Sequence, residues 1–362
     1  MDWTSPVPLT ADDDTGTTWH VRRAWPGKRP GDYVLEVSAP GRPGVRGARL
    51  RQGRFKLIPP DDPRLPALRA EAEQGELIAY RPYDRAVVKG EGRYTKIFRP
   101  GRAAVAAERS AQLNVVLDQG TFTTPGILSR RSQDVIDFSA IPGPTLYEVH
   151  SLTSDESFAR AWEKWSRAWA AQVSSPNGPA AQDVLNSLPL HSAERESGKV
   201  WRLVNLWLQH NEGVPELETP GDALRAAAQQ VTTDLLRTEP DPLVWAHGGL
   251  HDKQIISTDG TSPLGLLDFD ATARAEAALD LASMDVYLEL RLRKNHITPA
   301  RYLTAHTQVL CAAEELHVSP ARFQAYSEAR WLRLAYMPLP GRFSMALSVL
   351  AEMRGRYRTG TG

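Results

Sequence analysis

The sequence lacks several features that would place it in a special class of protein. Its 362 residues include a single cysteine, Cys311, so no disulfide can form within the chain, and no ligand spacing typical of structural zinc occurs. No apolar run approaches the roughly 20 residues of a membrane span, and residues 1–18 lack the apolar centre of a signal peptide. Acidic and basic residues balance at 43 each, so no overall field attracts nucleic acid or an anionic membrane. We expect a cytoplasmic globular protein with neither of these partners, whose metal, if any, arrives with a substrate.

Turn residues divide the first part of the chain into short strands. Four alternating segments before residue 60 are separated by Pro-Gly turns, which predicts a small antiparallel sheet over about 1–65. After the Pro-rich break the pattern predicts three strands, a helix over 102–119, two more strands and the linker Pro142-Gly143. Lys96 lies in the middle of the third strand of this block, and it is one of only eight lysines in the chain. A lysine inside an apolar strand is therefore a candidate functional residue.

From about residue 150 the hydrophobic spacing becomes helical. Phe158, Trp162, Trp165 and Trp169 recur at i, i+4, i+7 and i+11, which places four rings on one helix face. Such a stripe can bind a sugar or a base, but helical periodicity favours packing in the core. The sequence thus predicts an α+β protein with an N-terminal β-rich cap (1–65), a β-rich lobe (66–141) and a helical lobe (142–362).

One segment interrupts the helical pattern. It consists of the loop 247–254, His-Gly-Gly-Leu-His-Asp-Lys-Gln, and two short strands that end at the acidic segment 268–270. Phosphoryl transfer from ATP needs positioned phosphates and neutralised charge more than covalent help from the protein. Asp268 and Gln254 can offer oxygens to Mg²⁺. Lys96 can meet a phosphate, and Glu108 on the following helix can form a salt bridge with it.

Taken in order, these motifs resemble the aminoglycoside phosphotransferase and choline kinase-like family, whose fold is similar to that of protein kinases. Its members carry a strand lysine, a helix glutamate, a Pro-Gly-containing hinge, a loop H-G-D-x-x-x-x-N (or Q), then I-D-F and a later D-P-A-x-D-x-A. The resemblance spans about 76–290 and rests on the following positions: Lys96, Glu108, 139–143, 247–254, 267–269 and 277–282.

The resemblance implies a bilobal, protein kinase-like fold and an ATP- and Mg²⁺-dependent phosphotransferase that acts on a hydroxyl of a small molecule, such as a sugar or an antibiotic, or of a peptide. It also implies roles for individual residues. Lys96 contacts the ATP phosphates and Glu108 pairs with Lys96, while the main chain around Ser139 and Ile141 holds adenine. Gln254 and Asp268 hold Mg²⁺, and Asp280 braces the catalytic loop. The leading sheet, which is positive by four charges over 1–60, offers a surface for a protein partner.

The loop departs from the family pattern where the family has its catalytic aspartate. Gly249 stands there and has no side chain to orient or deprotonate a hydroxyl. One hypothesis is a working kinase whose proton acceptor comes from the rest of the loop, with Asp252, His251 and His247 as candidates. A second is a nucleotide-binding pseudokinase or partner-binding scaffold, and a third is new chemistry at the same site.

The nature of the acceptor stays open at this point. Residues 270–350 hold eight acidic and nine basic side chains, and this balance argues against a polycationic aminoglycoside. A neutral sugar or antibiotic hydroxyl, or a Ser or Thr hydroxyl of a peptide, suits the composition better.

Overall fold

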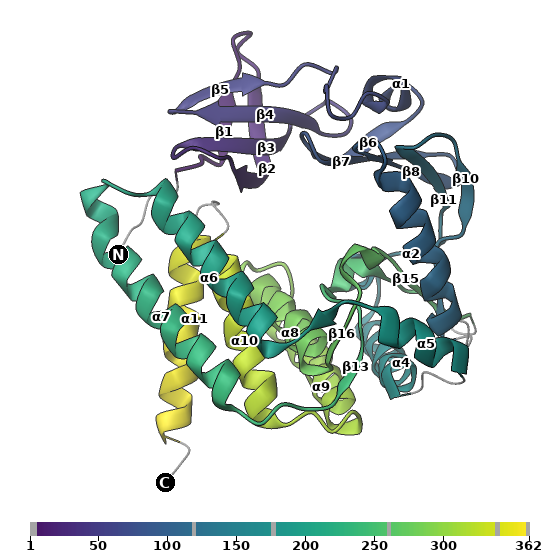
Figure 1. Ribbon diagram of the computed structural model, residues 1–362, viewed down its shortest axis with the longest axis vertical. Coiled ribbons are helices and arrows are strands. Elements are labelled where there is room, and N and C mark those ends of the chain that lie inside the picture. Colours follow the sequence, from purple (N-terminus) through teal and green to yellow (C-terminus); the bar gives the residue numbers. More distant parts are fainter. Residues whose placement is uncertain (1–5, 118–120, 175–178, 259–261, 337–340, 360–362) are drawn as a thin grey trace.

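The computed structural model describes residues 6–117, 121–174, 179–258, 262–336 and 341–359. Strands predominate in the first 140 residues and helices in the rest, so that a β-rich part lies above a helical part in Figure 1. The predicted α+β class, with a β-rich N-terminal region and a helical C-terminal region, is confirmed. In the described part of the chain we find no helix that is both long enough and apolar enough to span a membrane.

The N-terminal cap is a five-stranded antiparallel meander in which each strand pairs with the next. Trp19, Leu35 and Leu50 are buried on its inner face, as the alternation of apolar and polar residues requires. The strands are β1 (Thr10–Asp12), β2 (Thr18–Pro26), β3 (Asp32–Ser38), β4 (Arg46–Arg51) and β5 (Arg54–Leu57).

The second sheet has the strand order β10-β11-β8-β7-β6 and carries helix α2. Its edge strand β6 lies against the cap, because the Val45 amide donates to the Leu77 carbonyl at 2.8 Å and the Tyr80 amide donates to the buried Glu36 carboxylate at 2.7 Å. The cap thus covers an edge that would otherwise expose unpaired backbone groups. The elements of this part are α1 (Leu68–Ala72), β6 (Glu76–Arg81), β7 (Arg85–Gly90), β8 (Arg93–Phe98), α2 (Arg102–Leu117), β9 (Phe122–Thr123), β10 (Ile127–Arg130) and β11 (Val135–Ser139).

The predicted strands of these two sheets agree with the structure to within a few residues. The predicted helix over 102–119 is α2, and residues 118 and 119 lie outside the described residues.

The helical region holds two small sheets, β12-β16-β13 and β14-β15-β9, among its helices. Strand β9 comes from the first part of the chain and pairs in parallel with β15, so this small sheet joins the two regions. The elements are α3 (Leu146–Leu152), α4 (Asp155–Ser174), α5 (Pro179–Ser187), β12 (Leu190–His191), α6 (Ala193–His210), η1 (Pro215–Leu217), α7 (Glu218–Arg237), β13 (Leu243–Ala246), η2 (Asp252–Gln254), β14 (Ile255–Ile256), β15 (Leu264–Leu266), η3 (Phe269–Ala271), β16 (Ala273–Glu276), α8 (Ala278–Arg293), α9 (Pro299–Glu315), α10 (Pro320–Ala335) and α11 (Arg342–Thr359).

The aromatic stripe on α4 is part of the core, as its periodicity favours. Its four rings, Phe158, Trp162, Trp165 and Trp169, are at most 1% exposed. Trp169 also lies 5.6 Å from Trp245 on β13, the strand that leads into the loop 247–254. The stripe therefore supports the site rather than binding a ligand.

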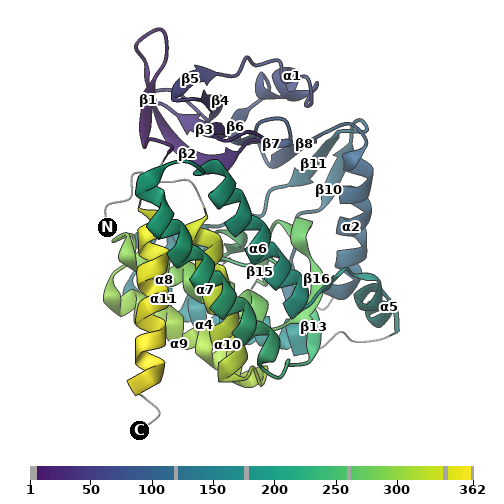
Figure 2. The same cartoon turned by 60° about the vertical axis from the view of Figure 1, so that its left-hand side comes forward.

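The cap also touches the helical region directly. The Nε2 of His210, at the end of α6, donates to the Gly27 carbonyl at 3.1 Å, and the His210 ring lies 5.1 Å from that of Tyr33. Figure 2 shows β2 above the end of α6 in agreement with these contacts. The β-rich part is thus joined to the helical part at its cap as well as through the linker.

A buried ion pair fixes β16 against α10. Glu276 accepts two hydrogen bonds from the Arg322 guanidinium, at 2.5 and 2.6 Å, and one from the Tyr326 hydroxyl at 2.9 Å. Glu276 and Arg322 are at most 1% exposed. Removal of either partner would leave the other charge buried and unpaired.

We predict that Glu276→Leu and Arg322→Met will each lower the free energy of unfolding by about 3–5 kcal/mol, and that the double variant will lose less than the sum of the two. Urea unfolding followed by circular dichroism measures all three values. Asp222→Ala, which removes an exposed ion pair with Arg225, is the control and should change stability by less than about 1 kcal/mol. Additive losses from the two buried substitutions would contradict the prediction.

Candidate active site

Two residues that are far apart in the sequence meet between the β-rich and helical regions. The Nζ of Lys96 on β8 lies 3.4 Å from Oδ1 of Asp268, which is 172 residues later in the chain. The same ammonium lies 3.8 Å from Oδ1 of Asp270. All three side chains keep part of their surface exposed. The structure therefore brings together the cation and the carboxylate that the sequence analysis singles out.

The backbone at Asp268 is unusual for an acidic residue. It has a left-handed conformation, with φ of 66°, directly after β15 and before the turn η3. Such a conformation is strained for a residue other than glycine and is concentrated at functional sites. Although desolvation works in the opposite direction, the charges of Lys96 and Arg85 hold the pKa of the Asp268 carboxyl below its ordinary value, so this residue is ionised at neutral pH.

Two arginines of the β-rich part, neither of them predicted from the sequence as a site residue, hold Asp270. Arg85 on β7 forms a 2.5 Å ion pair with the Asp270 carboxylate, and Arg109 on α2 donates to the Asp270 carbonyl at 2.8 Å. The chain is rich in arginine, and both residues are far from Asp270 in the sequence. No local sequence pattern therefore indicates that they contact it. The site thus contains two cations, Lys96 and Arg85, opposite two carboxylates.

Glu108 does not occupy the place that the family resemblance implies. It is exposed on α2, and no ion pair joins it to Lys96 among the described residues. The acidic partners of Lys96 are Asp268 and Asp270 instead. The expected pair is therefore corrected: in this structure the lysine is held from the helical region and not from α2.

Two backbone amides at the end of β11 and in the linker that follows it already donate hydrogen bonds within the β-rich region. The Ser139 amide donates to the Gly126 carbonyl at 2.8 Å, and the Ala140 amide donates to the Gly92 carbonyl at 3.0 Å. These two amides are not available to adenine in this conformation. Ile141 packs beside Gly265 of β15, where any larger residue would meet it. The predicted adenine site therefore lacks these two donors in this conformation.

Asp280, the first acidic residue of α8, organises the loop 247–254. Its buried carboxylate accepts the amides of His247 at 2.6 Å, Gly248 at 3.0 Å and Leu250 at 3.3 Å. Three backbone donors on one carboxylate fix the course of the loop, since buried amides need partners. This geometry matches the bracing role that the resemblance implies.

His247 is in a supporting position rather than a catalytic one. It is completely buried, and its Nε2 donates to the Leu267 carbonyl at 2.8 Å, one residue before Asp268. The imidazole thus ties the loop to the segment that carries Asp268. In this structure the ring has no exposed surface for contact with a bound acceptor.

Asp252 is likewise not placed to act as the base. It is buried, and its two oxygens accept from Nε and Nη2 of Arg291 on α8 at 2.8 and 2.7 Å. A bidentate arginine pair of this kind is strong and engages both oxygens of the carboxylate. The expectation that Asp252 replaces the missing aspartate is therefore not supported by the geometry.

His251 is a weak base in this environment. Desolvation is the main cause that lowers the pKa of its imidazole to about 3, and the neighbouring charges of Arg330 and Arg291 act in the same direction. Its Nδ1 accepts the Lys253 amide at 3.2 Å, which starts the short turn η2. At neutral pH the ring is unprotonated, and a group with such a low pKa is a poor general base.

Gln254 and Asp268 can supply oxygen ligands for Mg²⁺. The Gln254 amide oxygen accepts the His251 amide at 3.1 Å and has a second lone pair, and the Leu267 amide donates to the Gln254 carbonyl at 2.9 Å. Among the residues that the structure describes, no group of three or more His, Cys, Asp or Glu side chains could hold a metal. If these two oxygens hold Mg²⁺, its remaining ligands would come from phosphate and water.

Gly249 leaves open space in the braced loop. An added Cβ would meet no atom within 4 Å, and the backbone of Gly249 is not in the left-handed region. The adjacent Gly248 differs, because it has φ of 81° and its Cβ would collide with the Ala271 carbonyl. The structure thus requires glycine at 248 but accepts a side chain at 249.

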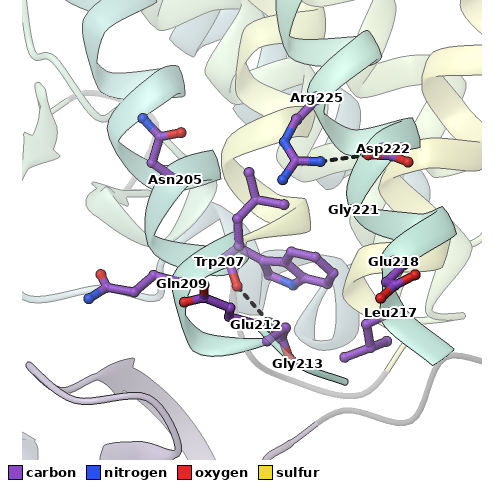
Figure 3. Close-up of a pocket in the computed structure, with 12 residues that line it drawn as sticks. Asn205, Trp207, Gln209, Glu212, Gly213, Leu217, Glu218, Gly221, Asp222 and Arg225 are labelled. Carbon is purple, nitrogen blue, oxygen red and sulfur yellow. Dashed lines mark hydrogen bonds and ion pairs between the residues drawn. The ribbon is translucent and has the colours of Figure 1, made fainter. Parts of the chain in front are cut away.

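A cavity of about 610 Å³ lies elsewhere, between α6 and α7 (Figure 3). Its lining includes Trp207, Glu218 and the Asp222–Arg225 ion pair, and none of the site residues described above. Its position separates it from the chemistry of Lys96 and Asp268.

Comparisons with known proteins give distant structural similarity. No family model and no curated protein matches the sequence. An aminoglycoside phosphotransferase, APH(3'')-Id, from Streptomyces rimosus is 18% identical with a TM-score of 0.45, and the match covers 68% of this chain and 89% of that one. The macrolide 2'-phosphotransferase MphH from Brachybacterium faecium is 18% identical with a TM-score of 0.44 and coverages of 76% and 86%. A Plasmodium vivax ethanolamine kinase is 12% identical with a TM-score of 0.42 and coverages of 74% and 77%.

These three proteins are of the kind that the motifs resemble. Because each TM-score is below 0.5, the similarity carries no weight for the activity of this chain, which depends on the geometry of its own site.

The low pKa of His251 predicts a specific loss of stability in acid. The unfolded chain binds a proton at this residue below about pH 6.5, whereas the folded chain does so only near pH 3, so stability falls as the pH is lowered through this window. We predict that His251→Asn, which keeps an acceptor for the Lys253 amide, will show a shallower decrease of Tm between pH 6.5 and pH 4.5. Parallel Tm profiles of the variant and the parent protein would contradict this.

Proposed function

We propose that this chain is an ATP-dependent phosphotransferase that moves the γ-phosphate of ATP to a hydroxyl of a small molecule. The observation that carries the proposal is the convergence of Lys96 and Asp268 at 3.4 Å from two different regions, beside a loop held by Asp280. Transfer of a phosphoryl group depends on cations that neutralise its charge and on a rigid loop that positions the acceptor. The site has both.

In this proposal the residues of the site have the following roles. Lys96 and Arg85 contact the phosphates, which requires them to exchange their present partners, Asp268 and Asp270, for phosphate oxygens. Asp268 and Gln254 hold Mg²⁺, which supplies further charge neutralisation when bound. The loop around Gly249 presents the acceptor hydroxyl. Because the transition state is loose, it makes small demands on a general base, and a slow reaction can proceed without one.

A nucleotide-binding pseudokinase is the second candidate, and one observation favours it. Asp252 is held by Arg291, His251 is a weak base and position 249 has no side chain, so the described residues of the loop contain no free carboxylate near the acceptor. The two candidates share the nucleotide site and differ only in turnover.

The first experiment tests the nucleotide site. We predict that Mg-ATP raises the Tm of the protein and that Lys96→Ala weakens its affinity by about tenfold or more, since a charged hydrogen bond contributes about 1.5–3 kcal/mol. Isothermal titration calorimetry measures the affinity. Lys89→Ala, an exposed lysine on the neighbouring strand β7, is the matched control and should bind normally. No binding by the parent protein at millimolar Mg-ATP would reject both candidates.

The second experiment restores the missing acid. The open space at Gly249 means that Gly249→Asp should fold normally, and we predict a rise in turnover towards the factor of about 10²–10⁴ that a positioned base contributes. Gly249→Asn has the same shape without the charge and should give no such rise. Release of labelled phosphate or product from ATP is the readout. Equal rates for Gly249→Asp and Gly249→Asn would show that no base acts at this position.

A further inference from the structure

Aromatic and cationic side chains form a continuous belt beside the loop 247–254. The ring of His251 meets the ring of Tyr287 on α8 edge-on at 4.8 Å, and the guanidinium of Arg330 on α10 lies 4.9 Å from the centre of the Tyr287 ring. The guanidinium of Arg291 lies 5.8 Å from Tyr287 and 4.3 Å from Tyr147 on α3. The belt therefore starts two residues from Gly249 and runs across three helices.

A lysine of the loop adds another cation to the belt. Lys253 is exposed, and its ammonium lies 4.2 Å from the centre of the Tyr147 ring, which the Arg291 guanidinium also contacts. Strand β2, which carries Arg22 and Arg23, lies on the side of the cap that faces the helical region (Figure 1). The belt thus combines cations of the loop with cations of the helices.

Carboxylates near the belt are few and already engaged. Asp252 is paired with Arg291, and Glu36 is paired with Arg23 at 3.5 Å. In the part of the chain that the structure describes, Lys253, Arg330, Lys294 and Arg22 form no ion pair. The Nε of Arg330 is also buried without a hydrogen-bond partner there, although its guanidinium bonds to the Tyr287 hydroxyl.

Positive charges in this region disfavour one another. Lys294 lies three residues after the belt residue Arg291, and its pKa is lowered to about 8 by desolvation and then by the charges of Arg342 and Arg291. Unpaired cations that are partly removed from water are unfavourable unless an anion joins them, and a planar guanidinium is suited to phosphate and carboxylate oxygens.

We propose that this belt is the acceptor site and that it binds a hydroxyl compound carrying an anionic group, a phosphate or a carboxylate, through Lys253 and Arg330. This proposal rests on the proposed phosphotransferase function and names its substrate class. The anionic group anchors the compound on the belt and leaves a hydroxyl beside Gly249. A polycationic acceptor is excluded by the same charges.

The test measures binding with the nucleotide site filled, so that added anions cannot occupy it. With saturating Mg-ADP, calorimetry compares ribose 5-phosphate with ribose, glucuronate with glucose, and kanamycin as a polycation. We expect at least one anionic compound to bind at least tenfold more tightly than its neutral partner, and kanamycin not to bind. Lys253→Gln and Arg330→Gln should each weaken that binding by about tenfold without changing the affinity for Mg-ADP. Lys56→Gln, an exposed lysine on β5, makes the same charge change and should have no effect.

The outcomes separate the two proposals. Suppose that Mg-ADP binds. If the neutral compounds or kanamycin then bind as tightly as the anions, or if both belt variants bind the anionic compound like the Lys56→Gln control, the proposal of an anionic acceptor is overturned. The proposal of a phosphotransferase is unaffected by that result. If Mg-ADP does not bind, the phosphotransferase fails. Anion binding measured without nucleotide and lost in Lys253→Gln would then still support the belt as an anion site.

Discussion

The ion pair between Lys96 and Asp268 is the contact on which the proposed site depends. It joins a strand of the β-rich part to a strained turn of the helical part, and Arg85 reinforces it through Asp270. In this state the cations that would meet phosphates are neutralised by protein carboxylates. An incoming nucleotide replaces one set of charge pairs with another, so it does not have to desolvate bare cations, and the net gain in free energy is smaller than the individual contacts suggest.

The sequence predicts the scaffold well because periodicity and turn chemistry are local. The strands of both sheets except β1, the buried stripe from Phe158 to Trp169 and the loop 247–254 with its two short strands follow from residue spacing. The partners within the site do not follow from it. Nothing local distinguishes Arg291, which holds Asp252, or Arg85, which holds Asp270, from the other arginines of the chain. The predicted Lys96–Glu108 pair is replaced for the same reason, since tertiary packing decides which acid reaches the lysine.

In the proposed site, the course of the loop around Gly249 does not depend on a side chain at that position. Asp280 fixes three backbone amides of the loop, and His247 ties the loop to the segment before Asp268. Neither contact uses a side chain at position 249. The loop therefore does not need a side chain at this position to keep its course. Gly248, with its left-handed backbone, is the glycine that the fold itself requires.

The contact between the cap and α6 closes the molecule into a ring. The two parts are joined by the linker near Gly143, by the pairing of β9 with β15 and, at the cap, by the hydrogen bond from His210 to Gly27. A ring of this kind resists the wide hinge opening that a single linker would allow. A single hydrogen bond contributes only about 0.5–1.5 kcal/mol, so the contact at the cap is the easiest of these connections to break.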